Sequence, residues 1–210
     1  MRYFASWRAC VLIGTMLGGL FPFAQVMFGQ EQSVDWGVLD LAARRYVECP
    51  STDNALLLYN ALPEMPLSGQ VDEGRLVGFV DYAFDNIDVL ERQVSVGDRN
   101  AVKLGLRLYN FAGGLNVMRL DCMMGNLARS HPRMFLEELK SAPNAQWIKK
   151  LGYPVDLSSF YFSEKWKAAH RFELEMRIKA LESVTDNSLV ELRDECIKKI
   201  KEFLAKVYHD

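Results

Sequence analysis

The stretch Arg99-Asn-Ala-Val-Lys-Leu-Gly-Leu-Arg-Leu-Tyr-Asn110 shows the pattern that decides the fold of this chain. Its apolar residues recur every three or four positions, which is the spacing of one face of an α-helix. Gly97-Asp98 precedes the stretch as a stop signal followed by a capping residue, and Gly113-Gly114 follows it as a terminator. We therefore expect a helix over residues 99–111.

Helical spacing continues along most of the chain, whereas alternating, β-branched runs that would predict strands are almost absent. The expected fold class is all-α: a short helical-repeat-like array or an irregular helical bundle, followed by a C-terminal helical hairpin. The segment 72–95 is either one helix with a kink near Asp85-Asn86 or two helices. The other expected helices cover residues 35–48, 52–62, 115–129, a short segment that starts at His131-Pro132, 159–183 and 187–208.

The last 56 residues of the chain contain neither glycine nor proline, and this change of composition predicts two long helices. We expect them to form a hairpin over residues 159–210 that packs on a helical domain of residues 31–158. Each helix carries an apolar stripe at helical spacing, and the two stripes should face each other. The first stripe holds Trp166, His170, Leu174, Ile178 and Leu181, and the second holds Leu189, Leu192, Cys196, Ile200, Phe203 and Val207.

The opening stretch is echoed by Asn54-Ala-Leu-Leu-Leu-Tyr-Asn60, since both segments begin with Asn-Ala and end with Leu-Tyr-Asn. In both cases the expected helix ends within a few residues, and an antiparallel helix should follow. This rhythm suggests helix pairs stacked side by side. The alternative is a coincidental likeness between two amphipathic helices, with each asparagine marking a helix end.

On these features residues 35–140 resemble HEAT- and armadillo-type helical repeat proteins, although no repeat consensus is present. The resemblance implies a curved helical surface that binds protein partners, and it implies no catalytic residue. The candidate partner-binding residues are Tyr59, Asn60, Tyr109 and Asn110.

The N-terminus is typical of a targeting segment. Arg2 and Arg8 precede a run from Ala9 to Phe28 that contains no charged residue. A basic start followed by an apolar run indicates a signal peptide, and the run is also long enough for an uncleaved membrane anchor. A buried N-terminal helix is the third alternative. The first two readings assign residues 1–30 to export and place the rest of the chain in the periplasm or outside the cell.

The charge balance gives no electrostatic case for nucleic-acid partners, although it leaves room for a local basic patch. The chain has 25 basic and 27 acidic residues, and without residues 1–30, which hold two of the arginines, the balance is 23 − 27 = −4. Nucleic-acid binding needs a basic face that neutralises phosphates, so we expect no nucleic-acid partner. Contact with a membrane is expected only through an uncleaved N-terminal segment.

Three cysteines, Cys49, Cys122 and Cys196, lie beyond the targeting segment. An oxidising compartment would permit one disulfide and one free thiol, but the spacing does not determine which residues pair. The alternative is three buried thiols, because each cysteine continues an apolar helical row.

Few residues form a pattern that carries chemistry. The histidines, His131, His170 and His209, have no metal-ligand spacing, and the chain has neither a Gly-x-Ser-x-Gly elbow nor a glycine-rich phosphate loop. Asp81, Asp85 and Asp88 would form one acidic row on an unbroken helix, which could hold a divalent cation or could simply be a solvated helix face. No cofactor is expected.

Aromatic residues gather where the hairpin should meet the rest of the chain. Trp147, Tyr153, Phe160 and Trp166 could line a groove for a small ligand or lipid, or could form the core that seats the hairpin.

These patterns favour an exported, non-catalytic helical scaffold that binds protein partners in the cell envelope or outside the cell. The first alternative is a small-ligand or lipid-binding protein that uses the aromatic groove. The second is an enzyme with dispersed carboxylates, among which Asp81 and Asp85 would be the first candidates.

Overall fold

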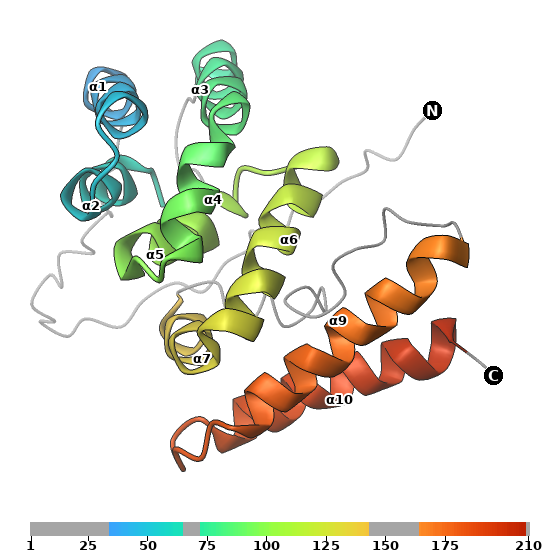
Figure 1. Ribbon diagram of the computed structural model, residues 1–210. Coiled ribbons are helices and arrows are strands. Elements are labelled where there is room, and N and C mark those ends of the chain that lie inside the picture. The colour runs from blue at the N-terminus through green and yellow to red at the C-terminus, as the bar shows by residue number, and fades with distance from the viewer. Residues whose placement is uncertain (1–33, 65–71, 143–163, 209–210) are drawn as a thin grey trace, which may run out of the picture. The chain divides into compact units, whose positions relative to one another are not determined.

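Nine α-helices and no strand form the part of the chain that the computed structural model describes, residues 34–64, 72–142 and 164–208 (Figure 1). The all-α fold class expected from the sequence is therefore confirmed. All described residues belong to one compact unit, Gln32–Asp210. The helices are α1 (Trp36–Glu48), α2 (Thr52–Ala61), α3 (Glu73–Asp85), α4 (Ile87–Ser95), α5 (Arg99–Leu108), α6 (Leu115–Ser130), α7 (Pro132–Ser141), α9 (Glu164–Glu182) and α10 (Val190–Val207).

Four of the described helices, α1, α2, α3 and α5, begin at a side chain that caps free backbone N–H groups. Asp35 accepts a hydrogen bond from the Val38 amide, Ser51 from the Asn54 amide and Asp72 from the Arg75 amide, at 3.1, 3.2 and 3.0 Å. These contacts satisfy donors that have no partner inside the helix. The helix α7 instead begins with Pro132, whose missing N–H is no loss at the first helical position.

The segment 72–95 forms two helices, which decides between the two alternatives left by the sequence. The break lies at Asn86, whose side-chain amide donates to the Tyr82 carbonyl at 2.9 Å. The same carbonyl also accepts the backbone N–H of Asn86, at 3.3 Å, so Asn86 caps the end of α3. Asp85 ends α3 and Ile87 begins α4.

The helix α5 lies among three neighbours, because it packs against α2, α4 and α7. Most of its residues are buried, including Val102, Leu104 and Leu108. Gly105 leaves room for the ends of the Met123 and Met124 side chains of α6, since a Cβ at this position would lie 2.6 Å from the Met124 methyl carbon. The helix ends at Leu108 rather than at residue 111, because Tyr109–Phe111 form a turn stabilised by backbone hydrogen bonds.

The two C-terminal helices pack against each other as the expected hairpin (Figure 1), and α9 also contacts α6 and α7. Their stripes face the core along most of their length, but Phe203 is only half-buried and Val207 is exposed. The buried members are His170, Leu174, Leu181, Leu189, Leu192, Cys196 and Ile200.

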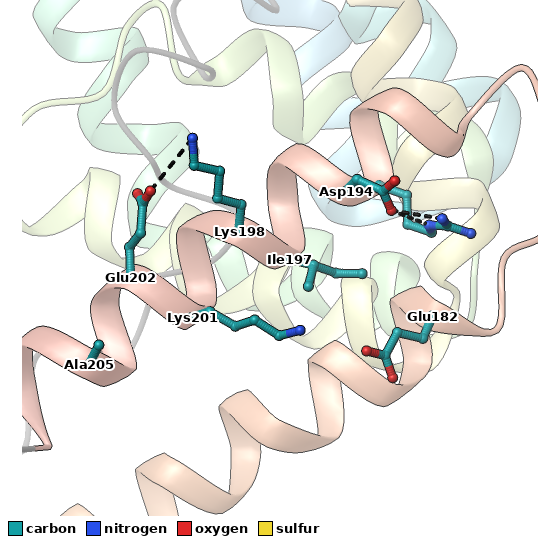
Figure 2. Close-up of a pocket in the computed structure, with 8 residues that line it drawn as sticks. Glu182, Asp194, Ile197, Lys198, Lys201, Glu202 and Ala205 are labelled. Carbon is teal, nitrogen blue, oxygen red and sulfur yellow. Dashed lines mark hydrogen bonds and ion pairs between the residues drawn. The ribbon is translucent and has the colours of Figure 1, made fainter.

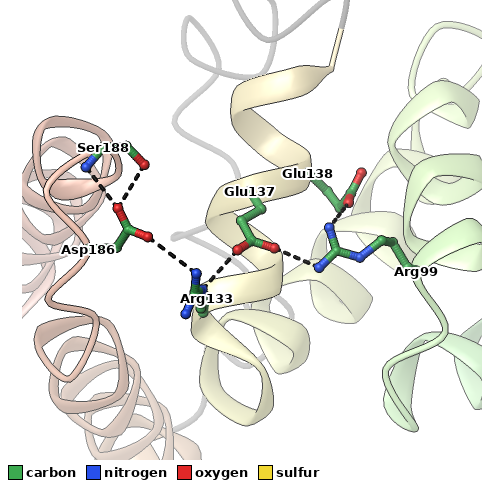
Figure 3. Close-up of polar contacts among 6 residues, drawn as sticks. All are labelled: Arg99, Arg133, Glu137, Glu138, Asp186 and Ser188. Atoms are coloured by element: carbon green, nitrogen blue, oxygen red, sulfur yellow. Dashed lines mark hydrogen bonds and ion pairs between the residues drawn. The ribbon is translucent and has the colours of Figure 1, made fainter.

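A chain of ion pairs connects α5, α7 and the loop between the hairpin helices (Figure 3). Arg99 on α5 donates to Glu137 and Glu138 at 2.6 and 2.8 Å, and Arg133 joins Glu137 to Asp186 at 2.9 and 3.3 Å. Hydrogen bonds from Arg99 and Arg133 lower the pKa of the Glu137 carboxyl. Because most of these side chains are solvated, each pair contributes little on its own, and their shared effect is to fix the register of three segments.

The burial of the three described cysteines differs from the expectation. Cys196 is buried and Cys122 is half-buried, as members of apolar rows can be. The expectation of a buried thiol is wrong for Cys49, which is exposed because it lies just after α1, where the chain turns toward Pro50.

No helix in the described residues combines the length and the apolar character needed to cross a membrane.

The Asp98 carboxylate should contribute more to stability than an ordinary helix cap. It accepts hydrogen bonds from the Asn100 and Ala101 amides and also from the Thr52 hydroxyl, so it connects α5 to the start of α2. We expect Asp98→Ala to lower the free energy of unfolding by about 2–3 kcal/mol, measured by urea unfolding at pH 7. Asp72→Ala is the control, because Asp72 caps only α3, and it should cost about 1 kcal/mol. Equal losses would show that the contact with Thr52 contributes nothing.

Candidate partner-binding groove

The two tyrosines of the echoed segments lie in different environments. Tyr59 is half-buried on α2, beneath the Arg107 guanidinium, whose carbon lies 4.8 Å from the ring centre. Tyr109 is buried after the end of α5, and its hydroxyl donates to Asp121 at 2.9 Å. Asn60 is exposed and Asn110 is half-buried. Although α2 and α5 are packed together, the two motifs do not form a pair of equivalent surface sites.

The predicted aromatic groove falls almost entirely outside the described residues. This applies to Trp147, Tyr153 and Phe160, and also to the side chain of Trp166, whose backbone belongs to α9.

The acidic row is divided between two helices. Asp81 and Asp85 are exposed on α3, whereas Asp88 is on α4 and forms an ion pair with Arg119. Among the described residues no group of three histidine, cysteine or carboxylate side chains is placed to hold a metal ion.

A groove between α1 and α3 has the features expected of a protein-docking site. It encloses about 520 Å³, and we call it the α1–α3 groove. Buried Ala43 and Phe79 and half-buried Tyr82 form its apolar floor. Its other lining residues are Asp40, Arg44, Glu48, Arg75 and Gly78.

The rim of the α1–α3 groove carries charges that are free to meet a partner. Asp40, Arg44 and Glu48 follow one another at four-residue spacing on α1, and Arg75 is on α3. All four side chains are exposed, and within the described part of the chain none of them forms an ion pair. Alternating exposed charge around an apolar floor is the composition of a binding rim around a buried centre.

Gly78 is the residue in the α1–α3 groove that the fold itself does not explain. It lies inside α3, where glycine costs about 1 kcal/mol relative to alanine because it loses more backbone freedom. A Cβ added at Gly78 would meet no atom within 4 Å, so no neighbouring side chain requires the glycine. An absent side chain on the wall of a groove permits the close approach of another backbone.

A second hollow, of about 700 Å³, lies along α10 near the end of α9 (Figure 2). Only Ile197 and Ala205 give it apolar lining, and two of its charged pairs are already closed. Lys198 pairs with Glu202 at 3.8 Å, and Arg193 with Asp194 at 2.7 Å. Because four of its charged side chains pair with each other, this hollow offers fewer unpaired charges among the described residues than the α1–α3 groove.

The α1–α3 groove escaped the sequence analysis because its walls come from helices that are separated by α2. The one local signal was Gly78, an isolated glycine inside a helical pattern. Such a glycine usually has a packing or functional role.

Comparisons of the chain with protein-family models, with curated proteins and with solved structures gave no match.

Substitution of Gly78 should show that the glycine does not serve stability. We expect Gly78→Ala to raise the free energy of unfolding by about 0.5–1 kcal/mol in urea unfolding, because alanine restricts the unfolded chain and meets open space in the folded one. Gly97→Ala is the contrasting control: Gly97 has φ 79°, and its Cβ would lie 3.1 Å from the His131 ring, so this change should cost about 1 kcal/mol or more. A loss of stability in Gly78→Ala would assign the glycine a structural role.

Proposed function

We propose that this chain is an exported, non-catalytic helical scaffold that binds a helical segment of a partner protein in the α1–α3 groove. The observation that carries the proposal is the combination of an apolar floor, four rim charges that form no ion pair with the described residues, and a helix-interior glycine that meets open space. Each of these features is unfavourable or unused in the isolated chain and becomes favourable when a partner covers the groove.

A helical occupant fits the groove better than an extended one. The walls are helices, whose backbone hydrogen bonds are satisfied internally, so no sheet edge is offered to an extended peptide. An amphipathic helix would place an apolar stripe on Phe79 and Tyr82, and Gly78 would allow its backbone to come close. Opposite charges on the flanks of such a helix would pair with the alternating row on α1, and this would fix its direction and register.

The carboxylates of the groove favour binding over catalysis. Asp40 and Glu48 are eight residues apart on α1, which corresponds to about 12 Å along the helix axis. Paired carboxylates that perform acid–base chemistry on one bond are about 5–9.5 Å apart. Arg44 lies between the two residues in sequence, and this order suits charge pairing along a partner.

Export is the part of the proposal that rests on sequence, namely on Arg2, Arg8 and the uncharged run from Ala9 to Phe28. Charges placed in this run should block insertion, because a charged residue is costly in the apolar interior of a membrane. We expect Leu17→Arg combined with Leu20→Arg to retain the protein in the cytoplasm, measured by fractionation and by protease protection in intact cells. Leu17→Ile with Leu20→Ile is the control and should leave the location unchanged. Export of the arginine variant would remove the basis for a targeting segment.

Photo-cross-linking tests the groove directly. We expect benzoylphenylalanine at Tyr82, on the groove floor, to give one discrete adduct with a partner protein in cells of the source organism. The same amino acid at Tyr59, which is also half-buried but lies outside the groove, should give none. The adduct should disappear when Gly78→Trp fills the groove and should persist with Gly78→Ala.

The controls separate a blocked groove from a damaged fold. Circular dichroism and urea unfolding should show that Gly78→Trp stays folded, because its side chain starts in open space. An adduct at Tyr82 that survives Gly78→Trp, or an adduct that forms at Tyr59 instead, would contradict docking in the α1–α3 groove. The second result would favour the surface that the sequence echo first suggested.

A further inference from the structure

Arg177 on α9 is buried without a hydrogen-bond partner in the described part of the chain. Only 3% of the residue is exposed, and neither Nε nor Nη1 of its guanidinium has an acceptor. Burial lowers the pKa of the guanidinium. Because arginine keeps its proton in proteins, the group stays charged, and a buried charge that lacks a partner is costly.

The guanidinium is pressed against α6 at Gly125. A Cβ built on Gly125 would lie 2.6 Å from Cζ, 2.6 Å from Nη1 and 2.8 Å from Nη2. Similar distances to three atoms of one plane mean that the guanidinium lies flat over the glycine. Glycine therefore leaves room for Arg177 between α6 and α9, and we call this place the α6–α9 seam.

The carboxylate that acts most strongly on the Arg177 charge is already engaged. Glu173 lies one turn before Arg177 on α9, and both of its oxygens accept hydrogen bonds from Arg129 of α6. The two arginines and this one glutamate leave an excess of positive charge at the seam. The glutamate thus compensates Arg129 and leaves Arg177 without a bonded anion.

A second unpartnered nitrogen lies on the same buried side of α9. His170 is 8% exposed, its Nδ1 is 2.6 Å from the Tyr208 hydroxyl, and its Nε2 has no partner among the described residues. Burial, and next the charge of Arg177, lower the pKa of this histidine, so the imidazole is neutral at pH 7. The seven-residue separation places it about 10 Å from Arg177 along the helix.

We propose that the α6–α9 seam is a binding site for an oxyanion, a carboxylate or phosphate group, which is held by the Arg177 guanidinium. An oxyanion would supply the acceptors that the guanidinium lacks, and charge-assisted hydrogen bonds of this kind are about twice as strong as neutral ones. Fully buried Leu174 and Leu181 flank Arg177 on α9, so the site would surround a charged head with apolar side chains. This chemistry admits a free small anion or the headgroup of an anionic amphiphile.

Thermal unfolding of the full-length chain, followed by tryptophan fluorescence at pH 7, distinguishes these sources. The additions are potassium phosphate, potassium acetate and potassium decanoate, each compared with potassium chloride at equal ionic strength. The test variant is Arg177→Met, and the matched control is Lys179→Met, which removes an exposed charge from the same helix.

At least one oxyanion should raise the unfolding midpoint of the wild type and of Lys179→Met by about 3 °C or more above chloride. The rise should vanish in Arg177→Met. A response to decanoate alone assigns an amphiphile headgroup, and a response to phosphate or acetate assigns a free anion. In chloride, Arg177→Met should unfold at the wild-type temperature or above it, because the change removes an unpaired charge.

Three results would overturn the proposal: no response to any of the oxyanions, an equal response in Arg177→Met, or a clear loss of stability of Arg177→Met in chloride. The last would show that Arg177 is satisfied by the chain itself. Gly125→Ala provides a second variant, because its Cβ displaces the guanidinium without removing it. It should also abolish the oxyanion response, and a response that persists would count against the site.

Discussion

The burial of α5 is the constraint on which the rest of the described structure depends. This helix contacts α2, α4 and α7, and its residues Val102, Leu104 and Leu108 are buried among them. At its start the Asp98 carboxylate connects it to α2, and Arg99 continues the contact into α7 and the ion pairs that reach the hairpin loop. Through these contacts α5 joins the N-terminal helices of the described structure to the C-terminal hairpin.

The helices themselves were predictable because their signals are local. A carboxylate or hydroxyl before an apolar run, a proline at a first turn and a glycine after a last turn act within a few residues. The environments of Tyr109 and Cys49 were not predictable in this way. Tyr109 is buried beside α6, where its hydroxyl donates a hydrogen bond to Asp121. Cys49 is exposed because α1 ends just before it. Both outcomes depend on the exact residue at which a helix ends. Sequence patterns leave this residue uncertain by one or two positions.

The candidate sites were harder to predict because each is built by helices that are distant in sequence. The α1–α3 groove joins Asp40 and Tyr82, and the α6–α9 seam joins Gly125 and Arg177. The apolar spacing predicted the stripe of α9 through His170, Leu174 and Leu181, but it gave no sign that Arg177 lies in the same buried arc. A charged residue within the buried stripe of a helix indicates a candidate binding site, but it can be recognised only when the buried face of the helix is known.

Each site contains one residue that lowers the stability of the isolated chain, and the two residues do so for opposite reasons. Gly78 lacks a side chain at a helix position where alanine would be more stable. Arg177 places a charge in the core, where an apolar side chain would be more stable. The caps of α1, α2, α3 and α5 and the buried part of the hairpin stripes agree with the fold. Positions that break a local rule without a compensating gain within the chain are often functional sites. We therefore favour the interpretation that Gly78 and Arg177 serve the binding of other molecules rather than the stability of the chain.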